Sequence, residues 1–183
     1  MKKIFFSFLF LLIFFGCFSY TFSESKKTSL EYADIVSDYQ LPYPGLLPDS
    51  PFYFLKMARD RIISLFISDP LKKAQFDILQ ADKRLNAGIF LFIRPDRKYQ
   101  LAITTISKGE NYYEDALSKL QDAKQQGMQV SDTGGNLIAS LKNQKQILEK
   151  LEIMVSGQNR QDLLKSEKSI EQFEKEATSN KLR

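Results

Sequence analysis

Residues 70–123, PLKKAQFDILQADKRLNAGIFLFIRPDRKYQLAITTISKGENYYEDALSKLQDA, decide the fold of this 183-residue chain. Apolar and small side chains recur there in alternating steps of three and four residues, first from Leu71 to Phe92 and again from Tyr99 to Ala123. This spacing places each set on one face of an α-helix. Arg94-Pro95 ends the first helix, because the residue before a proline resists the helical region, and Asp96 is expected to open the second.

Both faces alternate large side chains with small ones. The small residues are Ala74, Ala81 and Gly88 on the first face and Ala102, Gly109 and Ala116 on the second. Small residues let two helix backbones approach closely, while Leu, Ile and Tyr fill the spaces between them. The sequence therefore predicts that these two helices pack closely against each other.

An earlier helix is expected to begin at Ser50, as the capping residue, with Pro51 at the first helical position, and to stop near Ser68. Its apolar stripe, which we expect to be buried, is Phe52, Leu55, Ala58, Ile62 and Leu65. Asp69 followed by Pro70 repeats the same start signal.

After Gly127, the cluster of Ser, Asp, Thr and two Gly residues at 131–135 predicts a turn. A helix with coiled-coil spacing follows, at Leu137, Leu141, Gln144, Leu148, Leu151 and Val155, and Gly157 ends or kinks it. A last helical segment over 159–177 carries Leu163, Ile170 and Phe173, and residues 179–183 are expected to fray. Long helices joined by short turns pack antiparallel, so the predicted fold class is all-α, an antiparallel up-down helical bundle.

A proline-rich segment precedes the first helix, and its prolines (42, 44, 48 and 51) exclude a helix there. It also holds the apolar residues Leu41, Tyr43, Leu46 and Leu47, which are too many for a solvated linker. Two interpretations stay open. The segment is a brace that lies in a groove of the bundle and covers its open end, or it is a recognition surface for a partner.

The run 89–93, which includes Phe90 and Phe92, is apolar at five consecutive positions and so points all round a helix. One stripe cannot bury all five side chains. The run is therefore either covered by the proline segment and another helix, or in contact with a membrane or a partner.

The N-terminus has the pattern of a secretory signal: Lys2 and Lys3 are followed by an apolar run that ends at Gly16-Cys17. Cleavage after Ser23, retention as a membrane anchor and lipidation at Cys17 are three alternative fates. The expected organisation is a leader or anchor over 1–23, a flexible linker over 24–38, the bundle over 39–178 and a frayed tail. The bundle is expected on the outer side of the cytoplasmic membrane, in the cell envelope.

The composition excludes several classes of site. The chain has no histidine and no tryptophan, and Cys17 is its only cysteine, so no internal disulfide and no soft-ligand metal site is expected. No catalytic residue, cofactor or metal is predicted, since the chain lacks the Ser-nucleophile, Walker and dinucleotide-binding motifs. The basic residues form no stripe, which argues against nucleic acid as a partner.

Two charged sets are candidate sites with plainer explanations. Residues 59–61 (Arg-Asp-Arg) and 82–84 (Asp-Lys-Arg) would form a site only if they converged in a pocket, and otherwise form a solvated face with inter-helix ion pairs. Glu110, Glu114 and Asp115 have no calcium-binding loop around them. Neither set is therefore assigned a function.

Several motifs recur along the first part of the domain: LPYPGLLPDSPFYFLK at 41–56, RDR at 59–61, DPLKKA at 69–74 and ADKRL at 81–85. Together, over about Tyr39 to Leu120, they resemble the bacterial family called domain of unknown function 5667. The resemblance implies a helical domain outside the membrane, behind a leader or a single span. It implies no activity and no functional residues.

These observations together predict a non-catalytic, exported or membrane-anchored helical domain that binds an unknown protein partner or supports an envelope structure. One alternative is an envelope stress sensor or a chaperone-like helical hook, which an exposed apolar concavity between helices would favour. A second is an enzyme using carboxylate chemistry, which a buried pocket with two or more carboxylates would favour. The sequence leaves the oligomeric state open.

Overall fold

The computed structural model describes residues 31–36, 39–180 and 182. The predicted leader, Cys17 and the first part of the linker lie outside these residues. The chain divides into two compact units between residues 34 and 35, and the second unit carries the features below. Residues 31–35, which the sequence places in a flexible linker, form a short helix, and Ile35 is buried.

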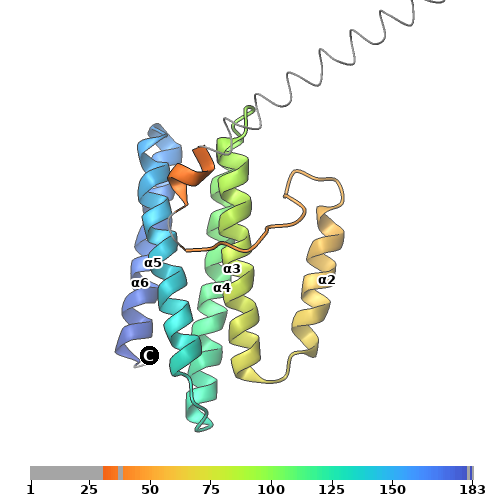
Figure 1. Cartoon of the computed structure of the whole chain (residues 1–183), viewed down its shortest axis with the longest axis vertical. Coiled ribbons are helices and arrows are strands. Elements are labelled where there is room, and N and C mark those ends of the chain that lie inside the picture. The colour runs from red at the N-terminus through yellow and green to blue at the C-terminus, as the bar shows by residue number, and fades with distance from the viewer. Residues whose placement is uncertain (1–30, 37–38, 181, 183) are drawn as a thin grey trace, which may run out of the picture. The chain divides into compact units, whose positions relative to one another are not determined.

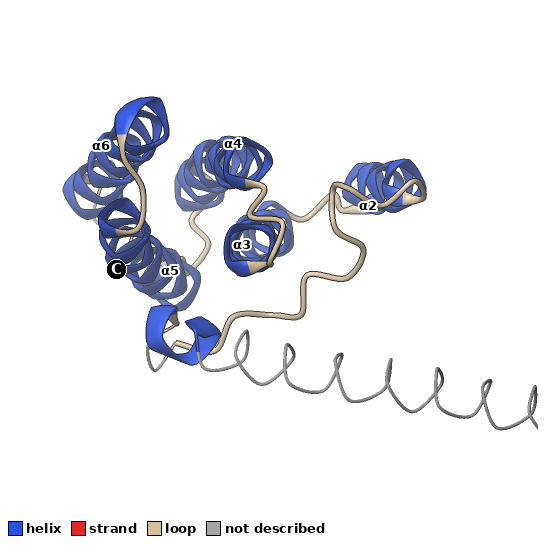
Figure 2. Ribbon diagram, turned by 90° about the horizontal axis from the view of Figure 1, so that it is seen from above, coloured by secondary structure: helices blue, strands red, loops and turns tan. Residues whose placement is uncertain are grey.

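The second unit is all-α, as predicted (Figure 1). Its helices are α2 (Tyr53–Phe66), α3 (Pro70–Ile93), α4 (Tyr99–Gln125), α5 (Ser131–Ile153) and α6 (Gly157–Ser179). Helices α3 to α6 form an antiparallel bundle in which α3 packs along α4 and α5 packs along α6 (Figure 2). Helix α2 stands to one side of this bundle.

Helix α3 begins and ends where the sequence predicts. The Asp69 side chain accepts hydrogen bonds from the backbone N–H groups of Leu71 and Lys72 at 2.8 and 3.0 Å, which caps the helix. Helix α4 begins at Tyr99 instead of next to Asp96. Asp96 was predicted to open it, but its carboxylate pairs with Arg94 and Lys98.

The close approach of α3 and α4 depends on two glycines. A Cβ atom added to Gly88 would lie 2.4 Å from Cγ1 of Ile106, and one added to Gly109 would lie 3.1 Å from Cβ of Arg84. Both distances are shorter than ordinary van der Waals contacts. The predicted close packing of these two faces is therefore confirmed. Tyr113 lies fully buried.

The start of α5 differs from the prediction. Residues 131–135 belong to the helix, and the turn lies before them, with Gly127 at a φ of +77°. Gly134 is needed for a different reason: an added Cβ would lie 1.6 Å from the carbonyl oxygen of Leu182. Leu182 itself is fully buried, so the prediction that the tail frays is wrong at this residue.

Candidate binding surface and its support

The proline segment is held to the bundle mainly by polar contacts. The hydroxyl of Tyr39 donates to Oδ2 of Asp82 at 2.8 Å, and Nδ2 of Asn86 donates to the carbonyl of Pro42 at 2.9 Å. From there the segment passes across α3 towards α2 (Figure 2). The segment thus contacts the bundle as a brace, and we call it the brace below. It crosses the side of α3, whereas the sequence predicted that its apolar residues would cover the open end of the bundle.

Asp82 is the centre of a buried polar cluster. Besides Tyr39, its carboxylate accepts a short hydrogen bond from Ser140 on α5 and one of 3.4 Å from Tyr113 on α4. Tyr113 and Ser140 also share a hydrogen bond of 2.7 Å. Burial raises the pKa of Asp82, and these hydrogen bonds oppose that rise. The cluster joins the brace to three helices, which makes it a structural fastening.

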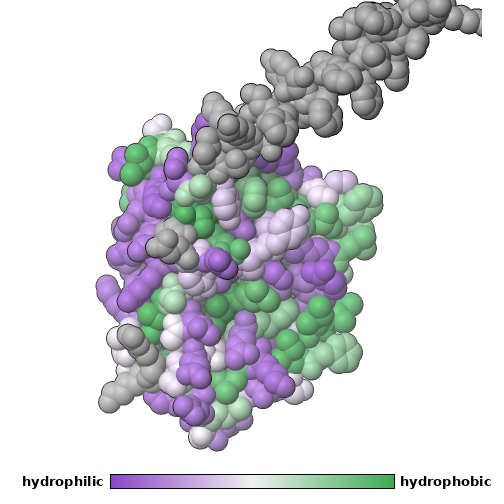
Figure 3. Space-filling view, in the orientation of Figure 1, coloured by the Kyte–Doolittle hydropathy of each residue, from purple (hydrophilic) through white to green (hydrophobic). Residues whose placement is uncertain are grey.

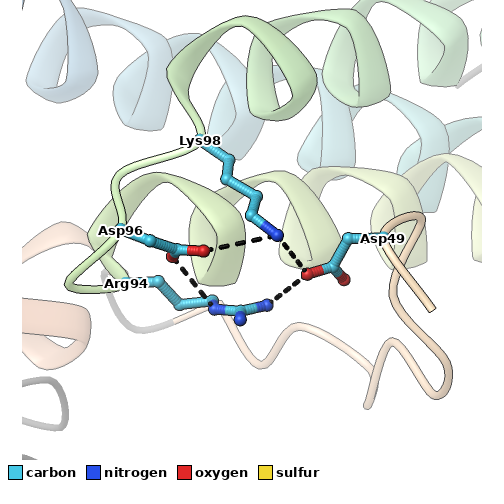
Figure 4. Close-up of polar contacts among 4 residues, drawn as sticks. All are labelled: Asp49, Arg94, Asp96 and Lys98. Carbon is cyan, nitrogen blue, oxygen red and sulfur yellow. Dashed lines mark hydrogen bonds and ion pairs between the residues drawn. The ribbon is translucent and has the colours of Figure 1, made fainter.

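A second fastening lies at the turn between α3 and α4 (Figure 4). Asp49 of the brace receives Arg94 Nη1 at 2.6 Å and Lys98 Nζ at 2.9 Å on the same oxygen. The hydrogen bond from Lys98, followed by that from Arg94, lowers the pKa of the Asp49 carboxyl. Asp96 contacts both cations from the other side and closes the network.

The apolar residues predicted to seat the brace are placed differently. Tyr43 is 80% exposed and Leu46 is exposed, while Leu41 and Leu47 are half-buried. The buried member is Pro44, whose carbonyl accepts from Nζ of Lys56 on α2 at 2.6 Å. The brace therefore leaves apolar surface open where the sequence predicted apolar contacts.

The apolar run at the end of α3 is largely buried, as the first of its two interpretations expects, and its aromatic contact is with α4. Ile89, Leu91 and Phe92 are fully buried, and Phe90 is half-buried. The Phe92 ring lies 4.6 Å from the Tyr99 ring of α4, centroid to centroid. Four of the five side chains of the run are therefore part of the core, and Phe90 is the one that is partly exposed.

Helix α2 is turned the opposite way from the prediction. The stripe that was expected to be buried is exposed: Phe52 and Leu55 are more than half exposed, Ala58 and Ile62 are exposed, and Leu65 is 76% exposed. Phe54 is also exposed, and Phe66 is 83% exposed. Apolar side chains consequently gather over α2, on the right of Figure 3. This prediction is wrong because periodicity identifies a face without identifying what covers it.

The side of α2 that points to the bundle is the more polar one. Its Asp60 is buried and accepts from Arg59 at 2.7 Å, and Ser64 accepts a short hydrogen bond from Lys73 of α3. Arg84 of α3 lies 5.9 Å from the Tyr53 ring centroid. Among the described contacts, Asp60 pairs within its own set and Arg84 contacts Tyr53 and Met57 of α2, so none of them joins the two charged sets of the sequence to each other.

Lys73 also contacts Asp77, one turn further along α3, at 3.3 Å. Asp77 is only 1% exposed, and its Oδ2 has no hydrogen-bond partner among the described residues. Burial raises the pKa of Asp77 to about 6, and Lys73 opposes this rise only in part. Asp77 is therefore a buried carboxylate that is only partly satisfied by Lys73.

Of the suspected calcium cluster, Glu110 is buried while Glu114 and Asp115 are exposed. Burial raises the pKa of Glu110, which lines a polar groove of about 420 Å³ between α4 and α6 with Asp162 and Ser166. Within the described part of the chain, no group of three or more His, Cys, Asp or Glu residues is placed to hold a metal ion. The cluster does not converge.

Sequence reasoning missed both the Asp82 cluster and the polar inner side of α2. The first brings Tyr39 and Ser140 to Asp82, although they lie 43 and 58 positions away from it in the chain. No local sequence pattern identifies contacts over such separations. The second had a signal: Lys56, Asp60 and Ser64 recur every four residues on one side of the helix.

None of the described helices is both long enough and apolar enough to span a bilayer. Comparison with protein-family models, with curated proteins and with solved structures gave no match to this chain.

Proposed function

We propose that this chain is a non-catalytic binding domain of the cell envelope, in which the bundle α3–α6 is a rigid support and α2 presents the binding surface. The observation that carries the proposal is the orientation of α2. Seven of its apolar side chains are exposed to solvent, whereas a helix that only completed a core would bury them.

The fastenings on either side of α2 support this division of roles. The brace before α2 is held through Tyr39 and Asp49, and the Asp69 cap fixes the start of α3 after it. Both ends of α2 are therefore positioned by polar contacts that do not use its apolar face. That face is left available to a partner.

Export is the other part of the proposal, and it rests on the leader pattern of Lys2, Lys3 and the following apolar run. A retained leader or a lipid on Cys17 would keep the domain at the membrane. Protease added to spheroplasts should then digest the domain, and mass spectrometry of the native N-terminus should identify which fate the leader has. Resistance to external protease would contradict export.

Photo-cross-linking tests the binding surface directly. Benzoylphenylalanine placed at Leu65 should give adducts with protein or lipid in intact cells, identified by mass spectrometry. The matched control is Ile153, an 85% exposed apolar residue at the end of α5, which should give none. Equal labelling from both positions, or no adduct from Leu65 or Phe54, would contradict the proposal.

One specific observation favours a chaperone-like hook as a second candidate. A groove of about 470 Å³ lies between α2 and the bundle, and its lining combines Met57, Ala58, Leu65, Phe76 and Tyr112 with the polar residues Asp60, Arg61 and Ser64. Such a concavity, with apolar side chains and a few polar groups, suits an extended segment of an unfolded chain. The domain should then slow the aggregation of a heat-denatured test protein, and Ala58→Arg should abolish this effect by filling the groove. No effect of the unmodified domain would exclude the hook.

A further inference from the structure

Six of the seven exposed apolar side chains of α2 lie on one continuous face, and the seventh, Ile63, lies beyond Arg59. With 3.6 residues per turn, Phe54, Leu65, Ala58, Ile62, Leu55 and Phe66 follow one another within about 120° around the helix axis. All six are exposed. An apolar arc of this width normally faces a hydrophobic core or another nonpolar phase, and on α2 it is exposed.

Arginine stands at both edges of this face. On the same helical wheel Arg61 comes next to Phe54, and Arg59 comes next to Phe66 at the opposite edge. Both arginines are exposed. Within Tyr53–Phe66 there are three basic residues and one acid, and that acid, Asp60, is buried against Arg59. The open side of α2 is thus apolar in the middle and positive at its borders.

This charge pattern decides between two occupants. If α2 paired with α2 of a second copy, arginines of both helices would border the same interface, with no exposed acid on either helix to neutralise them. An anionic lipid surface would instead present phosphates to both arginines. Arginine side chains are long enough to reach the phosphates from a helix whose apolar face lies among the acyl chains.

The position of α2 in the chain also favours a lipid surface as the partner. Under the proposed function, a retained leader or lipidated Cys17 holds the domain at a membrane. The 16 residues between Phe22 and Tyr39 can span at most about 60 Å, which limits how far the domain can lie from that surface. A short tether greatly raises the local concentration of a weak membrane-binding element.

We propose that α2 lies flat in the headgroup region of an anionic bilayer, with its apolar face among the acyl chains and Arg59 and Arg61 at the phosphates. This inference rests on the proposed function and names the partner of the same surface. Helix α2 would thereby orient the bundle relative to the membrane.

Tryptophan fluorescence can test this in the full chain, because the chain has no tryptophan of its own. Leu65→Trp puts a single reporter on the apolar face, and Ile153→Trp puts one on a distant exposed site. Each variant is reconstituted in vesicles of phosphatidylcholine and phosphatidylglycerol in equal amounts, with brominated acyl chains as quenchers. Emission from Leu65→Trp should shift to the blue and be quenched, and emission from Ile153→Trp should change little.

The charge requirement is tested in the same system. Adding Arg59→Gln or Arg61→Gln to Leu65→Trp should lower the bound-to-free ratio of α2 about five-fold for each arginine removed. Vesicles of phosphatidylcholine alone should lower it further. Emission from Leu65→Trp that is unquenched in anionic vesicles would overturn the proposal.

Different results would contradict the binding of lipid by α2 and the wider proposal that α2 is a binding surface. If Leu65→Trp is not quenched but a cross-linker at Leu65 captures a protein or a second copy, the lipid proposal is wrong and the binding surface stands. If neither lipid nor protein is found at Leu65, both are wrong. Quenching that is equal for charged and uncharged variants would also overturn the assignment to an anionic surface.

Discussion

The phenol of Tyr39 donates a hydrogen bond of 2.8 Å to the carboxylate of Asp82, a residue 43 positions later in the chain. Tyr39 belongs to the brace, and Asp82 lies in the buried middle of α3. Burial raises the pKa of Tyr39 as well as that of Asp82, so the pair is held as a neutral phenol donating to a carboxyl group. This contact fixes the start of the segment that leads to α2.

Tyr39→Phe should destabilise the domain by about 1–3 kcal/mol, because it removes a donor from a buried carboxylate without removing the ring. Urea unfolding followed by circular dichroism measures the change. Tyr43→Phe is the matched control, since the Tyr43 side chain is 80% exposed, and it should change stability by less than about 0.5 kcal/mol. Equal effects of the two changes would show that the Tyr39 hydroxyl contributes nothing.

Asp77→Asn should stabilise the domain at pH 7. The pKa of Asp77 is raised to about 6, above its ordinary value of 3.8, so the folded state binds a proton more tightly than the unfolded state does. This group therefore adds stability at low pH, and that contribution is lost as the pH rises from about 4 to about 6. The asparagine variant has no such loss, and it should be more stable by about 1–3 kcal/mol at pH 7.

The check for Asp77 is a pair of stability curves between pH 4 and pH 7. The unmodified chain should lose stability relative to Asp77→Asn over this range, and the two should come together near pH 4. Glu114→Gln, at an exposed position on α4, serves as the control for removing one negative charge. Two parallel curves would mean that Asp77 titrates normally.

Gly134→Ala should destabilise the domain, because the new Cβ would lie 1.6 Å from the carbonyl oxygen of Leu182 and the C-terminal segment would have to move. The expected loss is about 1–3 kcal/mol. Gly135→Ala is the neighbouring control: its Cβ would meet nothing within 4 Å, and the better helix propensity of alanine should add about 0.5–1 kcal/mol. Thermal unfolding of the two variants should thus shift in opposite directions.

Asp49→Asn should weaken the fastening at the turn between α3 and α4, by less than about 1 kcal/mol since the network is partly open to solvent. The pKa of Asp49 is lowered in the folded state, so its contribution is present at neutral pH and disappears as the pH falls through that lowered value. The difference between variant and unmodified chain should vanish in strong acid. A difference that persists there would assign the effect to something other than the ion pairs.

The sequence was sufficient for the bounds of α3 and for its contact with α4, because the signals for both are local. Asp69-Pro70 and Arg94-Pro95 mark the ends of α3, and the alternation of small and large residues identifies the contact with α4. Other features depend on residues far apart in the chain. Gly134 looks like part of a turn until Leu182 is placed against it.

The candidate site was predicted only in part for the same reason. The apolar stripe of α2, including Ile62 and Leu65, was identified correctly as a face, but its exposure depends on Asp60 and Ser64 contacting the bundle instead. Hydrophobic periodicity and the polar pattern at Lys56, Asp60 and Ser64 predict opposite orientations of one helix. Only the placement of α3 decides between them.

The separation of α2 from the bundle also divides the domain into regions of unequal local stability. A 14-residue helix is marginal by itself in water, and α2 buries few of its apolar side chains. Its amide hydrogens should therefore exchange with solvent through local opening. The amide hydrogens of α3 to α6 should exchange only when the whole bundle unfolds. A bound bilayer would slow exchange in α2 alone, so the helix would be most ordered when it is occupied.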